Sequence, residues 1–165
     1  MKKTLQILNE LEQTSLIGRF AIGGAVGATF YIEPFLTFDI DIFVALPTGK
    51  SGLITLAPLY EALRQRGYEE SDECVVIEGF PVQFLPAYNE LVEEALQEAR
   101  EVLFEDVPIR VLRAEHLIAI ALQTGREKDR QRVRMFVEQA EHDDNYLKTL
   151  LVRHNLSEKW KQWRA

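Results

Sequence analysis

The chain is poor in cysteine and lacks long apolar runs, and each shortage excludes a class of protein. Its 165 residues include a single cysteine, Cys74, so no internal disulfide can form and no cysteine-based zinc site can be assembled. The apolar residues Val75, Val76 and Ile77 follow it, and nothing nearby in the sequence would stabilise a thiolate. We therefore interpret Cys74 as a buried structural thiol.

No apolar run reaches the roughly 18 residues that a membrane-spanning helix needs. The N-terminal segment is amphipathic, because Asn9, Glu10 and Glu12 interrupt its leucines and isoleucine. A secretory signal would instead show an unbroken apolar stretch and a cleavage site of small residues. We therefore expect a cytoplasmic protein without membrane contacts.

Basic charge is also scarce, since the net charge is -7 at pH 7. This balance argues against a broad nucleic-acid interface, which needs a basic face. One local exception occurs in the C-terminal third, where five cations fall within nine residues. They are Arg126, Lys128, Arg130, Arg132 and Arg134.

The patterning indicates one globular domain over residues 1–165. With 47% apolar residues the chain can form a substantial core, and we find no repeat, low-complexity segment or linker. Predicted strands fall in a core region of about 15–112, whereas about 113–165 is helical throughout. We therefore expect an α+β fold, with a mixed β-sheet flanked by helices and a C-terminal helical segment.

Periodicity and capping residues locate the individual elements. Helices are predicted at residues 4–12, 25–32, 56–66, 90–100 with Asn89 as the cap, 114–123, 127–140, 143–153 and after 157. Strands are predicted at residues 20–22, 38–46, 75–77, 82–85 and 107–112. Turns are expected at 47–52 and 78–81.

Two carboxylates, Asp39 and Asp41, lie two positions apart on the best predicted strand. A strand alternates its side chains, so both project from one face, together with Phe43 and Ala45. A face open to water would explain the alternation, but not the two apolar residues on it. A divalent cation explains the acidic pair better, because Mg²⁺ prefers carboxylate oxygens and keeps waters and phosphate oxygens as further ligands.

A glycine pair, Gly23-Gly24, occupies the point where the predicted strand 20–22 leads into a helix. Glycines at such a turn let the backbone approach a ligand closely and direct N–H groups at an anion. The turn is therefore a candidate phosphate site.

Together these segments resemble the core motif of the nucleotidyltransferase superfamily, with its DNA polymerase β-like fold. That motif is a strand, Gly-Gly, a helix, and a strand bearing Asp-x-Asp. The family shows serine or alanine after the glycines and threonine or serine two before the first aspartate, and Ala25 and Thr37 agree. Residues 114–122 and 125–130 further resemble the helical motif of AbiEii-type nucleotidyltransferases, bacterial proteins often found as toxins of toxin–antitoxin pairs. The resemblance covers the chain from about Phe20 to Arg134.

The resemblance implies a reaction and a metal site. Asp39 and Asp41 would be the catalytic residues, holding Mg²⁺ (or Mn²⁺) on the triphosphate of an NTP. Gly23, Gly24 and Ala25 would form the phosphate turn. An acceptor hydroxyl would attack the α-phosphate and pyrophosphate would leave.

The same resemblance suggests further contacts and partners. Thr37 would contact phosphate or the turn, Arg126 and Lys128 would face the phosphates, and Asp129 would orient one of these cations. The alternative for this cluster is a solvated, charged helix start of little energetic value. Expected partners are the nucleotide, an RNA, protein or small-molecule acceptor, and a cognate antitoxin-like protein.

Two departures from the family pattern support a second hypothesis. A third carboxylate is expected on the strand at 81–85, where this chain has Gln83, and Glu78 or Glu33 are the substitutes we considered. Relatives carry a lysine where this chain has Ala121. The alternative is therefore a catalytically weakened relative that binds a nucleotide or a partner without transfer.

Overall fold

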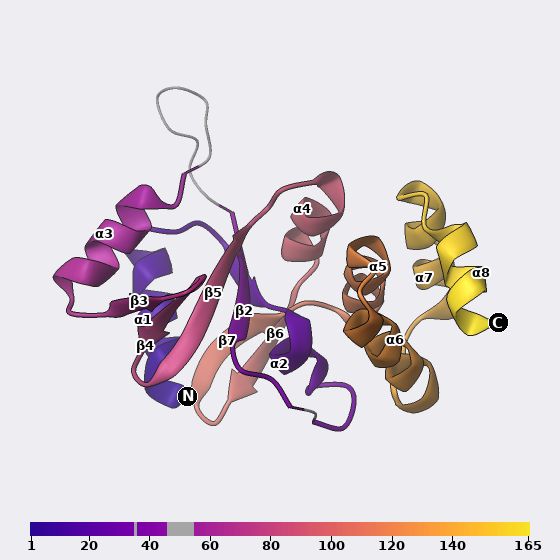
Figure 1. The fold of residues 1–165 in the computed structure, drawn as a ribbon, viewed down its shortest axis with the longest axis horizontal. Coiled ribbons are helices and arrows are strands. Elements are labelled where there is room, and N and C mark those ends of the chain that lie inside the picture. Colours follow the sequence, from indigo (N-terminus) through magenta and orange to yellow (C-terminus); the bar gives the residue numbers. More distant parts are fainter. Residues whose placement is uncertain (35, 46–54) are drawn as a thin grey trace.

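The computed structural model describes residues 1–34, 36–45 and 55–165 (Figure 1). The expected loop at 47–52 and the last residue of the expected strand 38–46 lie outside these ranges. Within them, no helix is both long and apolar enough to cross a membrane.

A mixed seven-stranded sheet forms the centre of the fold, in the order β3-β4-β5-β2-β1-β7-β6. The central pairs combine both directions: β2 is antiparallel to β1 and parallel to β5, and β1 is parallel to β7. The strands are β1 Phe20–Ile22, β2 Ile40–Val44, β3 Glu69–Ser71, β4 Cys74–Ile77, β5 Phe80–Pro86, β6 Arg100–Phe104 and β7 Val107–Val111. The expected mixed α+β architecture is confirmed.

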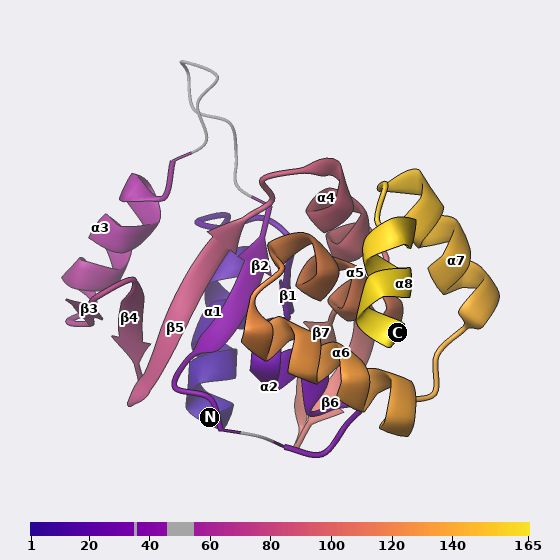
Figure 2. The ribbon, with the colours of Figure 1, turned by 45° about the vertical axis from the view of Figure 1, so that its right-hand side comes forward.

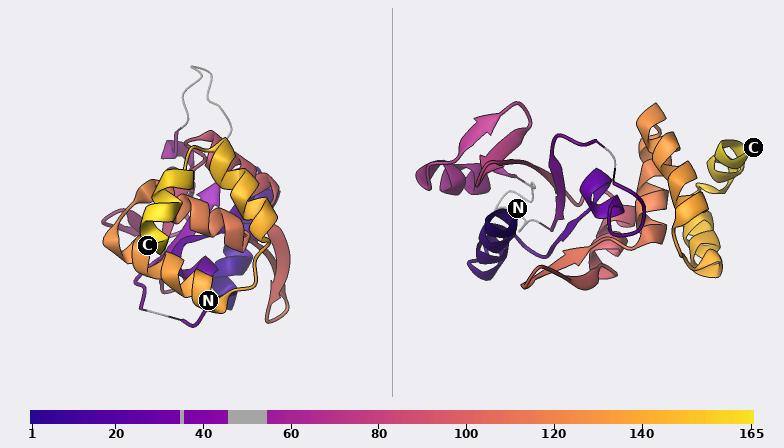
Figure 3. Two further views of the ribbon diagram at one scale, coloured as in Figure 1. Left: turned by 90° about the vertical axis from the view of Figure 1, so that its right-hand side faces the viewer. Right: turned by 90° about the horizontal axis from the view of Figure 1, so that it is seen from below.

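Helices cover both faces of this sheet. The described residues form α1 Lys2–Gln13, α2 Gly24–Ala28, α3 Ala57–Gln65, α4 Glu90–Gln97, α5 Ala114–Thr124, α6 Glu127–Gln139, α7 Asp144–Arg153 and α8 Ser157–Arg164. In Figure 2, α1 lies behind the sheet, whereas α5 and α6 lie in front of it. In Figure 3, the C-terminal helices form a layer at the end of the molecule opposite to α3 and the β3–β4 hairpin.

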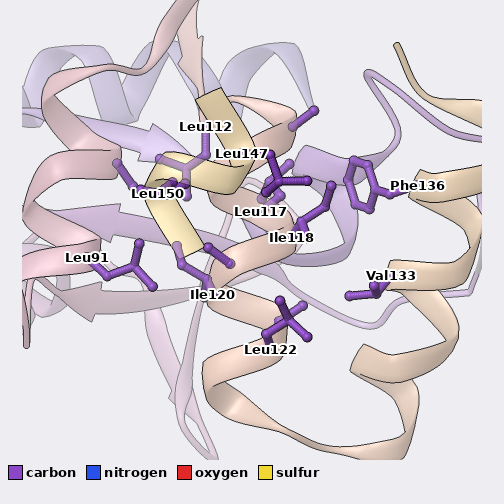
Figure 4. Packing of buried hydrophobic residues seen from close by; sticks show 14 of the residues in the cluster. Leu91, Leu112, Leu117, Ile118, Ile120, Leu122, Val133, Phe136, Leu147 and Leu150 are labelled. Carbon is purple, nitrogen blue, oxygen red and sulfur yellow. The ribbon is translucent and has the colours of Figure 1, made fainter. Parts of the chain in front are cut away.

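Alternation along the strands separates the core into two clusters. On one face, Phe20 and Ile22 of β1 and Ile42 of β2 pack with the leucines of α1 and α3. On the other face, Ala21 and Phe43 pack with α4 and the C-terminal helices. Figure 4 shows how α5 fills the centre of this second cluster. Its buried residues are nearly all apolar because it packs against α2, α4, α6 and α7 at once.

Several predicted boundaries were wrong. Strand β2 begins at Ile40 rather than at residue 38, and Phe38 is 80% exposed. Helix α2 ends at Ala28 rather than at residue 32, and α4 ends at Gln97 because Arg100 already belongs to β6. The cap of α4 is confirmed, since Asn89 Oδ1 accepts from the backbone N–H of Val92 at 2.9 Å.

Three hairpins differ from their predictions. The turn expected at 78–81 is confined to Glu78 and Gly79, whose φ angles of 51° and 84° suit a tight two-residue connection. Strands β3 and β6 were not predicted. Both are sheet edges rich in exposed side chains, so neither has the apolar alternation that marks a strand.

Candidate active site

The glycine corner lies directly against the Asp41 carboxylate. The chain turns from β1 into α2 at Gly23-Gly24, and the Gly23 N–H donates to the Asp41 carbonyl at 3.0 Å. Gly24 has a φ of +57°, and a Cβ at this position would overlap Asp41 Oδ2. A Cβ at Gly23 would overlap the Phe43 ring. Both glycines are therefore required by the close approach of the corner to β2.

Asp39 and Asp41 line one cavity of about 220 Å³ together with Gly24, Ala25 and Thr37. Asp41 projects from β2 on the face of Phe43, and Asp39 lies just before the strand. The Thr37 hydroxyl donates to the Asp39 carbonyl at 3.1 Å and lies 3.4 Å from Asp39 Oδ1. Phe43 is only 4% exposed. Helices thus cover this face at Phe43, whereas Asp39 and Asp41 themselves are half-buried in the lining of the cavity.

The acidic pair is electrostatically costly. Burial, and then the nearby charge of Asp39, raise the pKa of Asp41 from its ordinary 3.8 to about 6, although Arg132, Arg126 and Lys128 counteract this rise. A partly buried carboxylate next to a second one is stabilised when a cation neutralises the pair. At neutral pH the pair is therefore prepared to bind a positive ion.

Cations from the start of α6 line the same cavity. Asp129, which is 1% exposed, accepts from Arg126 Nε at 2.7 Å and from the Arg126 backbone N–H at 3.2 Å. Arg132 Nη1 lies 3.4 Å from the other Asp129 oxygen. Lys128 also lines the cavity. The cluster is thus more than a solvated helix start, because one buried carboxylate fixes two arginines beside Asp41.

Arg132 is a cavity residue that sequence reasoning missed. The basic run was noted, but only Arg126 and Lys128 were expected at the site. The signal was the spacing of Arg126, Asp129 and Arg132, which are three apart and therefore share one face of a helix.

Gln83 occupies the position next to Asp41 on the neighbouring parallel strand. The two residues are paired in register, and Gln83 lines the cavity. Neither proposed substitute is among the described residues of this cavity: Glu78 accepts from the Tyr68 hydroxyl, and Glu33 contacts Gln139 through its backbone N–H. An acid does approach Gln83, because Glu73 Oε2 accepts from its amide nitrogen at 3.0 Å.

The other departure, Ala121, also lies in the cavity. Its side chain is 3% exposed and joins Leu117 and Ile120 of α5 in an apolar part of the lining. Tyr88 and Thr124 complete this end. A small apolar residue thus stands where the sequence resemblance predicted a lysine, and the cations among the described lining residues all come from the start of α6.

Comparison with solved structures places the fold in a known class. No protein-family model matches the chain, and no curated protein matches its sequence significantly. The solution structure of the antibiotic-resistance factor ANT(2'')-Ia is 14% identical, with a TM-score of 0.56 over 96% of this chain and 93% of that one. The crystal structure of ANT(2'')-Ia in complex with adenylyl-2''-tobramycin is 15% identical, with a TM-score of 0.54 over 97% and 99%.

A third similar structure is an antigenic nucleotidyltransferase-like protein from Paracoccidioides brasiliensis. It is 14% identical, with a TM-score of 0.55 over 97% of this chain and 93% of that one. The fold of this chain is therefore nucleotidyltransferase-like, as the glycine corner and the Asp-x-Asp motif predicted. The narrower AbiEii-type resemblance stays a prediction.

The donor set suits a hard divalent cation that also binds a ligand. Among the described residues, no group of three or more His, Cys, Asp or Glu side chains can hold a metal by itself. Asp39, Asp41 and the Gln83 amide line the cavity, whereas the third carboxylate of the lining, Asp129, is bound to arginines. Mg²⁺ and Mn²⁺ accept carboxylate, carbonyl, water and phosphate oxygens. The residues fit a metal that arrives with a phosphate ligand.

Proposed function

We propose that this chain is a metal-dependent nucleotidyltransferase, which moves a nucleoside monophosphate from an NTP to an acceptor hydroxyl. The observation that carries the proposal is the pairing of two walls across one cavity. The acidic wall is Asp39 and Asp41 with Gly24, and the cationic wall is Arg126, Lys128 and Arg132. Gly23, which the sequence also predicted at the phosphates, is not among the described residues that line the cavity. A metal-bound triphosphate complements both walls, because its metal is positive and its phosphates are negative.

In this proposal Asp39 and Asp41 hold Mg²⁺ or Mn²⁺, which would neutralise charge on the reacting phosphate oxygens. Arg126, Lys128 and Arg132 bind phosphate oxygens, and Asp129 keeps the two arginines in place. Gly24 and Ala25 line the cavity beside the phosphates, and Thr37 holds the segment that carries Asp39. A bond forms between the acceptor oxygen and the α-phosphorus, the bond to the bridging oxygen breaks, pyrophosphate leaves and the hydroxyl proton passes to water.

We also propose that residues 1–165 act as one domain. The cationic wall belongs to α6, whereas the acidic wall belongs to β2. A chain without its C-terminal helices would lack one half of the site.

The acceptor is a molecule with a free hydroxyl, and its class is open among RNA, protein and small molecules. A small molecule has support from one similar structure, which holds adenylyl-2''-tobramycin. The net charge of -7 disfavours a broad RNA interface. A role in a toxin–antitoxin pair rests on the sequence resemblance alone, and expression in bacteria with and without the adjacent gene tests it.

A second candidate function is nucleotide or partner binding without transfer, and the observation in its favour is Gln83 beside Asp41. Calorimetric titration with ATP and Mg²⁺, together with a transfer assay, separates the two. Binding without turnover supports the second candidate, whereas robust transfer eliminates it.

The direct test is incubation with α-labelled NTPs, Mg²⁺ or Mn²⁺, and panels of RNA, protein and hydroxylated small molecules. We expect label on one acceptor class and none with the double variant Asp39→Asn/Asp41→Asn. Transfer that survives the double substitution would reject the assignment.

A further inference from the structure

The amide of Gln83 can help or oppose a cation, depending on which of its ends faces the cavity. Gln83 is in register with Asp41 on the adjacent parallel strand, and both line the cavity. A glutamine amide has an oxygen that accepts and an NH₂ group that only donates. The oxygen would be a ligand for a divalent cation, whereas the NH₂ group would repel it.

Glu73 decides this orientation. Its Oε2 accepts from Gln83 Nε2 at 3.0 Å, and an ionised carboxylate has no hydrogen to donate, so only the NH₂ end of the amide can face it. The C=O and C–NH₂ bonds of an amide diverge from one carbon, so an acceptor bound to the NH₂ group does not occupy the oxygen. Gln83 lines the cavity and Glu73 is not among the described residues that do. The carbonyl oxygen of Gln83 is therefore not the atom that contacts Glu73, and it can face the cavity that Gln83 lines.

The hairpin that carries Glu73 explains how an exposed side chain keeps this position. Ser71 of β3 pairs with Cys74 of β4, so Asp72 and Glu73 form a tight two-residue turn, with Asp72 at a φ of 56°. Strand β4 in turn pairs antiparallel with β5, with Val75 opposite Val82. This register brings the start of β4, and the turn before it, next to Gln83. Pairing of the edge strand β3 with β4 thus fixes the turn, and the turn holds Glu73 near Gln83.

We propose that Glu73 is a positioning residue, which orients the Gln83 carbonyl oxygen towards the metal site so that this oxygen replaces a third carboxylate. The inference rests on the proposed function, because it concerns the same metal. Carbonyl oxygens suit Mg²⁺ and Mn²⁺ as ligands, although a neutral oxygen attracts the ion less than a carboxylate does. With Gln83 in place of the third carboxylate, the site therefore still offers three oxygen ligands, but with one negative charge fewer.

The test measures Mn²⁺ affinity of the full chain, in the presence of a non-hydrolysable ATP analogue, by the electron paramagnetic resonance signal of free Mn²⁺. Residues behind a metal ligand affect metal affinity by roughly 10–100-fold, and we expect about a tenfold loss for Glu73→Ala. The matched control is Asp72→Asn, which removes the same charge from the same turn while asparagine tolerates its positive φ. We expect less than about a twofold change for this control, since an exposed charge is well screened.

A double-mutant cycle separates orientation from charge. In a Gln83→Asp background the ligand at position 83 is a carboxylate with no NH₂ end, so Glu73→Ala should no longer weaken Mn²⁺ binding. A second readout needs no metal: the Gln83 side-chain NH₂ resonances, assigned by their loss in Gln83→Asp, should shift in Glu73→Ala and stay in place in Asp72→Asn.

The possible results distinguish the two proposals. If the wild-type chain binds no Mn²⁺ with the analogue, both the proposed function and this inference fail. If Asp41→Asn abolishes binding while Glu73→Ala behaves like Asp72→Asn, the metal site stands and the positioning role is rejected. A tenfold loss in Glu73→Ala that persists in the Gln83→Asp background would also reject it, because the effect would then not pass through the amide.

Discussion

The two walls of the cavity are built in different ways. The acidic wall is a backbone construction: a glycine corner without side chains lies against a strand that alternates acid and apolar residues. The cationic wall is a side-chain construction, in which buried Asp129 holds Arg126 and Arg132 at the start of α6. The acidic wall depends on glycines that have no Cβ, and the cationic wall depends on hydrogen bonds between side chains. Substitutions should therefore damage the two walls by different physical routes.

The largest expected effect comes from adding one methyl group to the acidic wall. Gly24→Ala combines a positive φ with a Cβ that would overlap Asp41 Oδ2, so the carboxylate must move. A displacement of about 1 Å at a reacting centre costs roughly 100-fold in rate, and we expect at least that loss of transfer activity. Gly67→Ala is the matched control, because Gly67 has a φ of +87° but open space around its Cβ. It should cost only the local backbone strain, about 1–3 kcal/mol of stability, with transfer unchanged.

Breaking the cationic wall should have the next largest effect. Asp129→Asn removes the charge that fixes two arginines, and Arg132 is only 9% exposed. We expect the free energy of unfolding to fall by about 2–3 kcal/mol, below the 3–5 kcal/mol typical of fully buried pairs because Arg126 is half exposed. Affinity for inorganic tripolyphosphate should fall about tenfold. The control Glu158→Gln, at an exposed pair with Lys161, should change stability by less than about 0.5 kcal/mol in urea titrations.

Neutralising the acidic wall should stabilise the metal-free protein at pH 7. Burial and Asp39 raise the pKa of Asp41 from 3.8 to about 6, so the folded state binds this proton more tightly than the unfolded chain. Stability is therefore lost as pH rises from about 4 to about 6, and it stays lost above that range. Asp41→Asn avoids the loss, and we expect a gain of about 1–3 kcal/mol at pH 7 in EDTA and none at pH 4. An equal gain at both pH values would point to packing rather than charge.

The smallest effect concerns Cys74, which is half-buried rather than buried as expected, and which lies in register with Gln83 on the face that carries Asp41. Burial, followed by the charges of Asp39 and Asp41, raises the pKa of the Cys74 thiol. Alkylation by iodoacetamide at pH 8 should therefore be slower than for a free thiol. Mn²⁺ with an ATP analogue should speed it about two- to threefold, because neutralised carboxylates oppose the thiolate less. If the alkylation rate of the native protein is the same with and without Mn²⁺, the Cys74 thiol is not affected by the charge of the acidic wall.

The acidic wall was readable from the sequence because its signals are local. A spacing of two on a strand places Asp39 and Asp41 together, and the Gly23-Gly24 turn precedes them by a short connection. The core helices and central strands were predicted for the same reason, since each has an apolar period of its own. Phe38 was misplaced because apolar character alone does not show where a strand begins.

The rest depends on contacts between distant segments. Strands β3 and β6 are edges whose exposed residues show no apolar period, so only pairing defines them. Arg132 lines the cavity because α6 packs beside α5. Glu73 contacts Gln83, ten residues later in the sequence, because β4 pairs with β5. Their roles appear only after the sheet order and the helix layer are known.

The most direct measurement is a crystal structure of the chain with Mn²⁺ and a non-hydrolysable ATP analogue, with Mn²⁺ located by anomalous scattering. The account predicts one Mn²⁺ bound by Asp39 and Asp41, with the triphosphate extending from it to Arg126 and Arg132. Mn²⁺ bound elsewhere, or a nucleotide outside the space between these residues, would contradict it.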